Sequence, residues 1–355
     1  MTWRRRDVLA ASVGALALLA GCAPRLQPPG PGLRPGGPPP RLDGDGHAVM
    51  RDGLRLPLRR WTRGAGDPAV VLIALHGFND YGHAFAEAGP FLANRGIAVW
   101  APDQRGFGDT PHRGLWAGTA RLTNDLRDLV ALARQTYPRA RVLVLGESMG
   151  GAVVLATLGA PVDPARVDGA VLVAPAVWGA EGRPLLARLL MPLVSHAIPW
   201  MTFTGEGLDI WPSDNRDWLL HLSRDPLTLK ETRVDAVAGL FDLMDAAHAA
   251  LPRVAAPVLV MLGENDHLVP IDATLPAMRA LVGEGRDPLR RPALYRDGWH
   301  MLLRDLSGVL ALEDIIAWVR DPRAPLPSGA DTQARALLAG DLTLSPRETP
   351  AWPAY

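Results

Sequence analysis

The chain has 355 residues, of which 48% are hydrophobic and 21% are charged. This composition is typical of a globular protein with an ample core, built as one large domain or as one domain with an insertion, and it excludes disorder throughout. Basic and acidic residues number 37 each, so the formal net charge is zero. That balance removes the usual electrostatic reason to propose nucleic acid as a partner, and we expect a neutral or apolar substrate.

The N-terminus resembles a bacterial export signal. Arg4-Arg5-Arg6 precedes an apolar stretch from Val8 to Ala20, which ends at Gly21-Cys22. The pattern resembles a lipoprotein signal, in which the cysteine is diacylated and becomes the first mature residue, and the paired arginines also resemble a twin-arginine signal. A membrane-spanning anchor is the alternative, but this stretch would span only about 20 Å of a ~30 Å hydrocarbon core.

We therefore expect residues 1–21 to be a signal peptide and Cys22 to be the lipidation site. Cys22 is the only cysteine in the chain, so no disulfide and no thiolate metal cluster can form. Two acyl chains would tether the protein to a membrane of the bacterial cell envelope, facing the periplasm or the exterior. Residues 22–45 are rich in Pro and Gly, which predicts an extended spacer that holds the folded domain clear of the bilayer.

Strand and helix patterns then alternate, which predicts an α/β fold with a mostly parallel central sheet and helices on both faces. A hairpin is expected around Asp52-Gly53, from His47 to Arg51 and from Leu54 to Thr62. Later strands are expected at 70–75, 97–101, 141–145, 169–175, 257–263 and 293–295, and helices at 83–95, 122–137, 273–282 and 306–319.

The alternation breaks at residues 177–256, which are too long for a bare loop. We interpret this segment as an inserted helical cap. Its first part is unusually apolar, which suits either contact with an acyl chain or packing on the domain beneath. The hydrolase domain would span residues 46–320, and residues 321–355, interrupted by prolines, predict a loosely ordered tail with one helical turn near Thr332 to Leu338.

Ser148 is the predicted nucleophile. It lies in Gly146-Glu147-Ser148-Met149-Gly150, between an apolar run and an Ala/Val/Leu-rich stretch, and so at a strand-to-helix turn. The pattern Gly-x-Ser-x-Gly is weak by itself, but this context makes it strong. Glycines at both ends let the backbone fold back tightly and expose the serine hydroxyl above the sheet.

A serine hydroxyl needs a base to take its proton, and the base needs an orienting carboxylate. In this architecture the acid and then the histidine follow the serine, each at the end of a later strand. Asp266 and His300 satisfy that order. Asp272 is the rival acid, although its position at a helix start suits an N-cap.

The remaining histidines are interpreted as surface or structural residues. His267 is adjacent to Asp266, so it could hardly be oriented by it and also face Ser148. The others lie before the final strands or in the cap: His83, His112, His196, His221 and His248.

The negative oxygen of a tetrahedral intermediate needs preorganised donors, usually two backbone N–H groups. Met149 follows the nucleophile and supplies one. Phe78, in the glycine turn after the strand at 70–75, is expected to supply the other. His76, at the end of that strand, suits a structural hydrogen bond that holds the turn.

Residues 46–320 resemble the α/β-hydrolase superfamily, and more narrowly its monoacylglycerol lipase and lysophospholipase-like group, often described as serine aminopeptidase-like. The resemblance rests on the following motifs: His76-Gly77-Phe78, Pro102-Asp103-Gln104-Arg105-Gly106-Phe107-Gly108, Gly146-Glu147-Ser148-Met149-Gly150-Gly151, Gly263-Glu264-Asn265-Asp266 and Gly298-Trp299-His300. It implies a triad of Ser148, Asp266 and His300, oxyanion donors at Phe78 and Met149, and no cofactor or metal. Two departures are Glu147, where a histidine is common, and an oxyanion loop without the acidic-His sequence of monoacylglycerol lipases.

The expected function is hydrolysis of carboxylic esters of single acyl chains, such as monoacylglycerols or lysophospholipids, through an acyl-enzyme. A short-peptide aminopeptidase or a general carboxylesterase of the same fold is the alternative within the enzyme class. A non-catalytic envelope lipoprotein that binds lipid is the alternative from a different class.

Overall fold

The computed structural model describes residues 24–32, 38–64, 66–179, 182–183, 185–205, 207, 210–283, 285 and 287–350. The expected signal peptide, residues 1–21, and the expected lipidation site, Cys22, lie outside the described residues. So do Ala23 and residues 33–37 of the expected spacer, and the last five residues of the chain.

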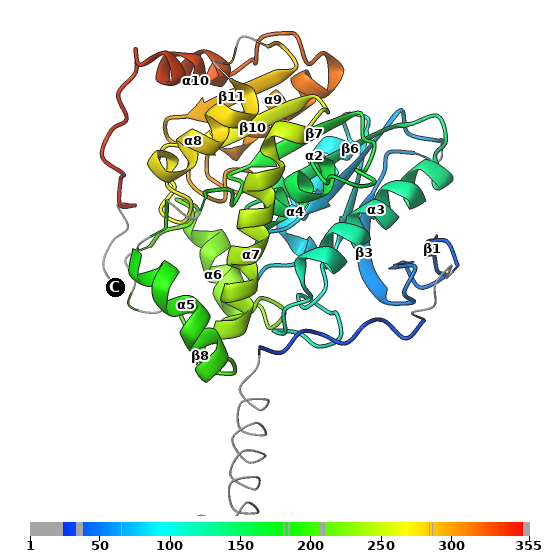
Figure 1. Ribbon diagram of the computed structural model, residues 1–355. Coiled ribbons are helices and arrows are strands. Elements are labelled where there is room, and N and C mark those ends of the chain that lie inside the picture. The colour runs from blue at the N-terminus through cyan, green and yellow to red at the C-terminus, as the bar shows by residue number, and fades with distance from the viewer. Residues whose placement is uncertain are drawn as a thin grey trace, which may run out of the picture.

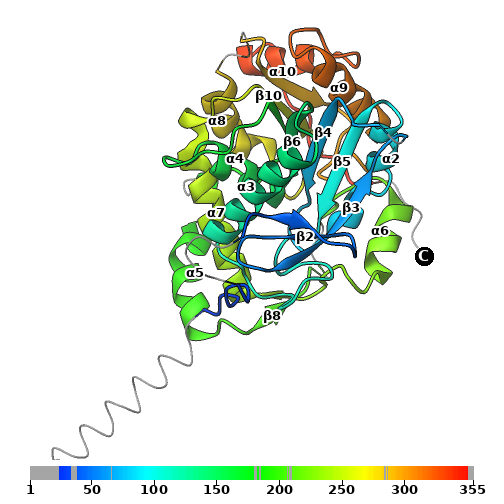
Figure 2. The same ribbon diagram turned by 90° about the vertical axis from the view of Figure 1, so that its right-hand side faces the viewer.

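A nine-stranded sheet forms the centre of the molecule, in the order β1-β2-β3-β5-β4-β6-β7-β10-β11 (Figures 1 and 2). The strands from β5 to β11 in this order are parallel, whereas the first three form antiparallel pairs at one edge. Their bounds are β1 Arg41–Leu42, β2 His47–Val49, β3 Arg55–Trp61, β4 Val70–Leu75, β5 Ile97–Pro102, β6 Arg141–Glu147, β7 Gly169–Val173, β10 Val258–Gly263 and β11 Arg290–Tyr295. The expected α/β fold with a mostly parallel sheet is confirmed.

Continuous apolar sequence makes these strands the centre of the core. Every residue of β4 is buried, and alternate side chains enter different hydrophobic clusters. Val71 and Ile73 pack with one set of helices, and Leu72 packs with the other. A strand that is buried on both faces needs apolar residues at every position, because successive side chains point to opposite faces.

Helices cover both faces of the sheet. One face carries α3 Thr119–Thr136, α4 Met149–Leu158, α7 Val234–Ala250, α8 Ile271–Val282 and α10 Ala330–Ala339, and the other carries α2 Ala88–Ala93 and α9 Gly308–Arg320. The helix expected at 83–95 is instead a short 3-10 helix, η1 Gly82–Phe85, followed by α2. Pro90 lies in the first turn of α2, where its missing N–H leaves no helical hydrogen bond unmade, so it favours a helix that begins there rather than one that began at residue 83.

The segment between β7 and β10 contains α5 Leu185–Ala197, β8 Thr202–Phe203, α6 Arg216–Arg224, β9 Thr232–Arg233 and α7 (Figure 1). The cap boundaries remain a prediction, but α7 packs on α4 and belongs to the core through Leu243 and Ala247. The part that lies outside the layers around the sheet therefore ends near β9. Among the described residues, none of the helices combines the length and hydrophobicity that crossing a bilayer requires.

The structure departs from the expected free spacer at residues 24–32, which lie along the domain as a strap. The N–H of Gln27 donates to the Trp116 carbonyl at 2.9 Å, and the N–H of Gly30 donates to the Asp52 carboxylate at 3.0 Å. At the beginning of the strap, the N–H of Arg25 donates to Asp235 at 3.1 Å. An extended Pro-rich backbone forms no internal hydrogen bonds, so its polar groups are free to pair with the domain surface.

The structure also departs from the expected loose tail, because α10 packs against β11. Ala334, Leu337 and Leu338 are buried in the main core cluster. Asp331, at the start of α10, is fully buried and lies 2.7 Å from the guanidinium of Arg291 at the start of β11. The sequence pattern predicts only one helical turn here. A short run of apolar residues does not show which surface will cover the helix, and packing supplies most of a helix's stability.

The Asp331 pair gives a test of this packing. Replacing Asp331 with Ala leaves the Arg291 guanidinium buried without its carboxylate partner, and breaking such a pair costs about 3–5 kcal/mol. We expect the free energy of unfolding, measured by urea denaturation, to fall by an amount of that order. The exposed Asp341→Ala is the control, and equal stability of the two variants would contradict the packed arrangement.

Candidate active site

Ser148 lies in the turn between β6 and α4, with backbone angles of φ 53° and ψ −116°. Few residues other than glycine adopt a positive φ, and the surrounding structure must hold them there. The N–H of Ser148 donates to the Val173 carbonyl at 2.9 Å, and its carbonyl accepts from the N–H of Ala176 at 3.0 Å. Both partners come from β7 or the loop after it, so the neighbouring strand fixes the turn.

The flanking glycines are required by space. A Cβ atom on Gly146 would lie 2.4 Å from the carbonyl oxygen of Gly150, and one on Gly150 would lie 2.3 Å from that of Leu75. Both distances are far inside van der Waals contact, so no other residue fits without a backbone shift. The same closeness brings the end of β4 next to Ser148.

Asp266 and His300 are joined by a hydrogen bond of 2.7 Å between Oδ2 and Nδ1. Both side chains are buried. The other carboxylate oxygen of Asp266 accepts from the N–H groups of Leu268 and Val269 at 2.8 and 2.7 Å, which fixes its orientation. Because Nδ1 carries the proton toward Asp266, Nε2 is the nitrogen of the neutral ring that is left to accept one.

The electrostatic surroundings favour the protonated form of His300. Burial opposes a charge on the imidazole, but the Asp266 carboxylate outweighs it through its charge and its hydrogen bond, and the net effect raises the pKa of His300. Glu147 adds to this increase, whereas Arg304 opposes it.

The predicted residues gather at one edge of the sheet. Ser148, Asp266 and His300 follow the carboxyl ends of β6, β10 and β11, which are separated in the sheet only by β7. Within the described residues, no hydrogen bond joins Ser148 to His300. In proteins without a bound substrate such contacts are often long and tighten only when the substrate binds.

The loop after β4 lies against the serine turn. A Cβ atom on Gly77 would lie 3.4 Å from the Ser148 Cβ. The backbone N–H groups of Phe78 and Met149 donate no hydrogen bond to any part of the chain that the structure describes. Two unpaired donors beside a serine are what a developing oxyanion requires.

His76 holds this loop, as the sequence predicted. The N–H of Gln104 donates to His76 Nε2 at 2.9 Å, so Nδ1 carries the proton and donates to the Gly77 carbonyl at 2.7 Å. Burial lowers the pKa of His76, which keeps this neutral tautomer.

The rival candidates lie elsewhere. Asp272 does not cap α8; it lies in the first turn and pairs with Arg347 at 2.8 Å on the surface. His267 contacts the Glu348 carbonyl at 2.9 Å in an exposed position. Neither is hydrogen-bonded to Ser148 or His300.

Sequence reasoning missed Arg304, a buried arginine that pairs with both Glu147 and Asp80. A signal was present, because Glu147 directly precedes the nucleophile at a position that must be buried at the end of a central strand. A buried carboxylate requires a cation or several donors. Nothing in the spacing shows which of the many arginines supplies it.

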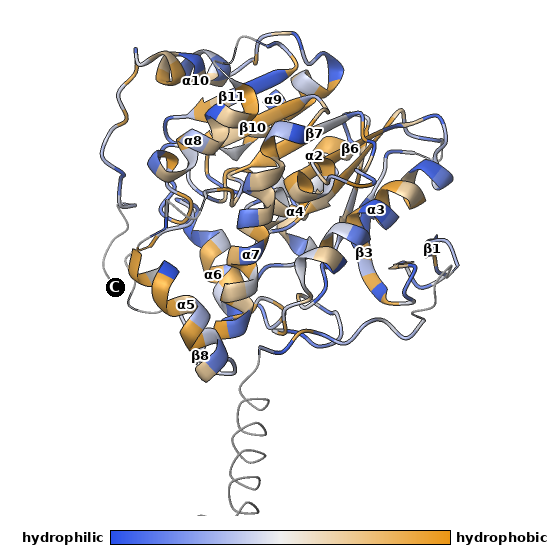
Figure 3. Cartoon of the chain, viewed as in Figure 1, coloured by the Kyte–Doolittle hydropathy of each residue, from blue (hydrophilic) through white to orange (hydrophobic). Residues whose placement is uncertain are grey.

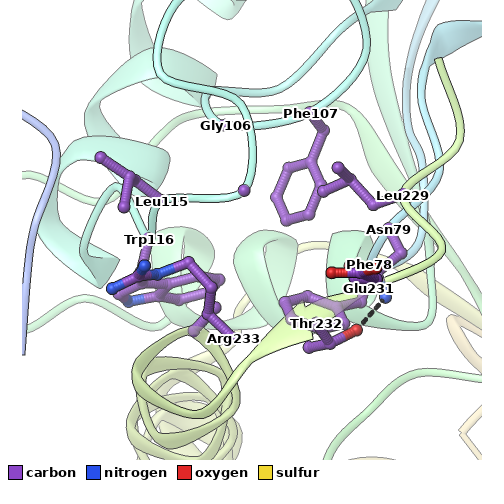
Figure 4. A pocket seen from close by; sticks show the side chains of 12 residues that line it. Phe78, Asn79, Gly106, Phe107, Leu115, Trp116, Leu229, Glu231, Thr232 and Arg233 are labelled. Carbon is purple, nitrogen blue, oxygen red and sulfur yellow. Dashed lines mark hydrogen bonds between the residues drawn. The ribbon is translucent and has the colours of Figure 1, made fainter. Parts of the chain in front are cut away.

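A small apolar cavity with a volume of ≈ 10 Å³ adjoins the Phe78 loop (Figure 4). Phe78, Phe107 and Trp116 line it together with Leu229 and Thr232 of the cap segment. A larger cavity of ≈ 590 Å³ lies between the strap, α5 and α7. Neither is lined by Ser148, Asp266 or His300, and no cluster of side chains suited to a metal ion occurs among the described residues.

The sheet order, the strained serine turn and the acid and histidine after later strands define an α/β-hydrolase. The family model "Serine aminopeptidase, S33" matches residues 66–307. The chain belongs to this family, and it is a serine carboxylic-ester hydrolase.

Curated relatives include a monoacylglycerol lipase of Mycolicibacterium smegmatis, 26% identical over 75% of this chain and 93% of the relative. A monoglyceride lipase of Mus musculus is 25% identical over 77% of this chain and 89% of the relative. Among solved structures, a soluble variant of monoglyceride lipase from Saccharomyces cerevisiae, in complex with a substrate analog, has a TM-score of 0.64 at 18% identity and covers 84% of this chain and 100% of that one. The monoacylglycerol lipase of Paleococcus ferrophilus has a TM-score of 0.61 at 20% identity, over 75% and 99%.

The surroundings of His300 give a second test. We expect NMR titration of the imidazole to give a pKa above the ordinary value of about 6.5. Asp266→Asn should lower that pKa, because it removes the negative charge and leaves the effect of burial. Asp272→Asn is the control and should leave it unchanged. A pKa of His300 at or below the ordinary value in the unmodified protein would contradict this account of the site.

Proposed function

We propose that this chain hydrolyses monoacylglycerols and related single-chain lipid esters, with Ser148 as nucleophile, His300 as base and Asp266 as its orienting acid. The observation that carries the proposal is the Asp266–His300 hydrogen bond of 2.7 Å, which leaves Nε2 free at the sheet edge that presents the strained Ser148. The names of the relatives support the substrate class.

In the proposed mechanism, Ser148 Oγ attacks the ester carbonyl carbon while its proton passes to Nε2 of His300. The N–H groups of Phe78 and Met149 stabilise the resulting oxyanion. Asp266 stabilises the imidazolium through Nδ1. Collapse breaks the bond to the glycerol oxygen, which takes the proton from His300 and leaves an acyl group on Ser148. Water, activated by the same histidine, then releases the fatty acid.

His300 must be neutral to act as the base. Because its pKa is raised, the proposed reaction slows as the pH falls through a value above about 6.5 and is not impaired by this group at higher pH.

The exposed apolar residues of the cap support an apolar substrate. Four leucines of α5 are each about two-thirds exposed: Leu185, Leu186, Leu189 and Leu193. Figure 3 shows hydrophobic segments along this helix. A soluble monomer rarely exposes a contiguous apolar patch of this kind unless it binds a lipid, a membrane or a protein. The proposal assigns these leucines to contact with lipid.

Labelling with a fluorophosphonate tests the proposed nucleophile. We expect the wild type to be labelled and Ser148→Ala to be unlabelled, with hydrolysis of p-nitrophenyl butyrate reduced on the order of 10⁶-fold. The exposed Ser223→Ala is the matched control and should behave as the wild type. Labelling of Ser148→Ala at the wild-type rate would exclude Ser148, and absence of labelling in the wild type would favour the non-catalytic lipid-binding alternative.

A substrate panel then tests the specificity. Monoacylglycerol, lysophospholipid, short esters and aminoacyl-peptide substrates are compared by kcat/KM. The proposal requires monoacylglycerol to be among the best substrates. Preference for the aminoacyl compounds would identify a peptidase instead. Preference for acetate esters would identify a general carboxylesterase.

We also propose that the protein is a bacterial envelope lipoprotein anchored through diacylated Cys22. Two observations support a membrane-proximal orientation. Pro24 and Leu26, shortly after Cys22, line the same cavity as Met191 and Pro192 of α5. The exposed leucines of α5 therefore occur near the point where the tether would leave the domain. Trp200 and Phe203, which follow α5, are about half exposed, and such aromatic side chains favour membrane interfaces.

Incorporation of radiolabelled palmitate tests the anchor. We expect the wild type to incorporate label and to sediment with membranes, because two acyl chains give stable anchoring. Cys22→Ala should incorporate none and should appear in the soluble fraction with its esterase activity intact. Equal incorporation by the two proteins would exclude Cys22 as the lipidation site.

A further inference from the structure

Arg304 connects loops that come from different strands. It lies four residues after His300 and is only 3% exposed. Its Nη1 donates to Asp80 at 2.6 Å, and its Nη2 pairs with Glu147. Glu147 directly precedes Ser148, and Asp80 follows Phe78 by two residues. One guanidinium thus joins the turn that carries Ser148 and the loop that carries Phe78 to the loop that carries His300.

The cap holds the backbone of Arg304 in place. Asn215, at the N-terminus of α6, donates from its side-chain amide to the Arg304 carbonyl at 2.8 Å. The guanidinium carbon lies 5.6 Å from the ring centroid of Trp218, the third residue of α6. The N–H of Met301 donates to the Pro212 carbonyl at 2.8 Å, just before α6. The arginine is therefore fixed at its backbone as well as at its head group.

General stability does not explain this arrangement well. A buried ion pair is often no more stabilising than apolar residues of similar volume, because removing charges from water is costly. Arg304, Glu147 and Asp80 are all at least 94% buried, since their exposed fractions are 3%, 2% and 6%. What the planar guanidinium does provide is directional pairing with two carboxylates at once, which restricts the geometry of the groups that carry them.

We propose that Arg304 is a positioning residue, which sets the distances between Ser148, the Phe78 N–H and His300 by clamping Glu147 and Asp80. The proposal rests on the function proposed above and adds to it. It also accounts for Glu147, which stands where a histidine is common in monoacylglycerol lipases. An acidic residue before the nucleophile is the partner that a buried arginine requires.

The clamp has an electrostatic signature. Three charged groups have the largest effects on the pKa of His300: Asp266 after β10, Glu147 at the end of β6 and Arg304 on its own loop. The carboxylates raise this pKa, and Arg304 lowers it. Loss of Arg304 should therefore move the acidic limb of the activity profile to higher pH. Loss of the Glu147 charge should move it to lower pH.

The test compares Arg304→Met with Arg291→Met, which removes another buried, ion-paired arginine, at the opposite end of β11 from His300. With p-nitrophenyl butyrate we expect Arg304→Met to lower kcat about 100-fold with little change in KM, as misplacement by about 1 Å does. Arg291→Met should lower Tm and leave kcat unchanged. Arg304→Lys should recover only part of kcat, because an ammonium cannot bind both carboxylates in the same fork.

A triple variant separates positioning from the cost of unpaired charges. Asp80→Asn and Glu147→Gln combined with Arg304→Met remove both carboxylate charges together with the arginine, so Tm should recover while kcat stays low. If kcat returns with Tm, or if Arg304→Met has the kcat and pH profile of Arg291→Met, Arg304 is only structural and the proposal is wrong. The proposed function is tested separately, by the labelling and activity of Ser148→Ala and by the substrate panel.

Discussion

The structure depends on a steric constraint at the end of β6. The chain turns from strand to helix within Gly146 to Gly150. A side chain is excluded at Gly146 because the turn folds back on its own backbone, and at Gly150 because the turn passes close to the end of β4. That contact forces Ser148 into a positive φ and places it beside the loop that carries Phe78. This packing makes the turn unfavourable for most sequences. It also brings the serine hydroxyl together with two unpaired N–H groups.

A buried carboxyl group attaches the cap to the loop that carries His300. Ser213 donates to the Asp305 carboxylate at 2.7 Å, and the other oxygen of Asp305 accepts from the N–H of Trp299, also at 2.7 Å. Burial raises the pKa of Asp305 to about 7, although both hydrogen bonds favour its charged form. The residue before His300 is thus linked to the segment before α6 through one buried carboxyl group.

The sequence predicted what is local. Ser148, Asp266 and His300 each follow an apolar strand, and that position could be recognised without knowing any long-range contact. Arg304 could not be identified, because its partners Glu147 and Asp80 are distant in sequence and many arginines were available. The burial of α10 could not be predicted for the same reason. This helix packs against β11, and no local pattern shows which helix will pack on a given strand.

The strap shifts the point at which the folded unit begins. The sequence placed that point at residue 46, whereas the buried Gln27 and the hydrogen bonds to Trp116 and Asp52 show that the fold recruits residues well before it. A shortened protein that started at the first hairpin would lose the hydrogen bonds that the strap donates to the Trp116 carbonyl and to the carboxylate of Asp52. These oxygens would then face solvent. Residues 24–32 are therefore part of the folded enzyme, and their length and path are constrained by the surface that they follow.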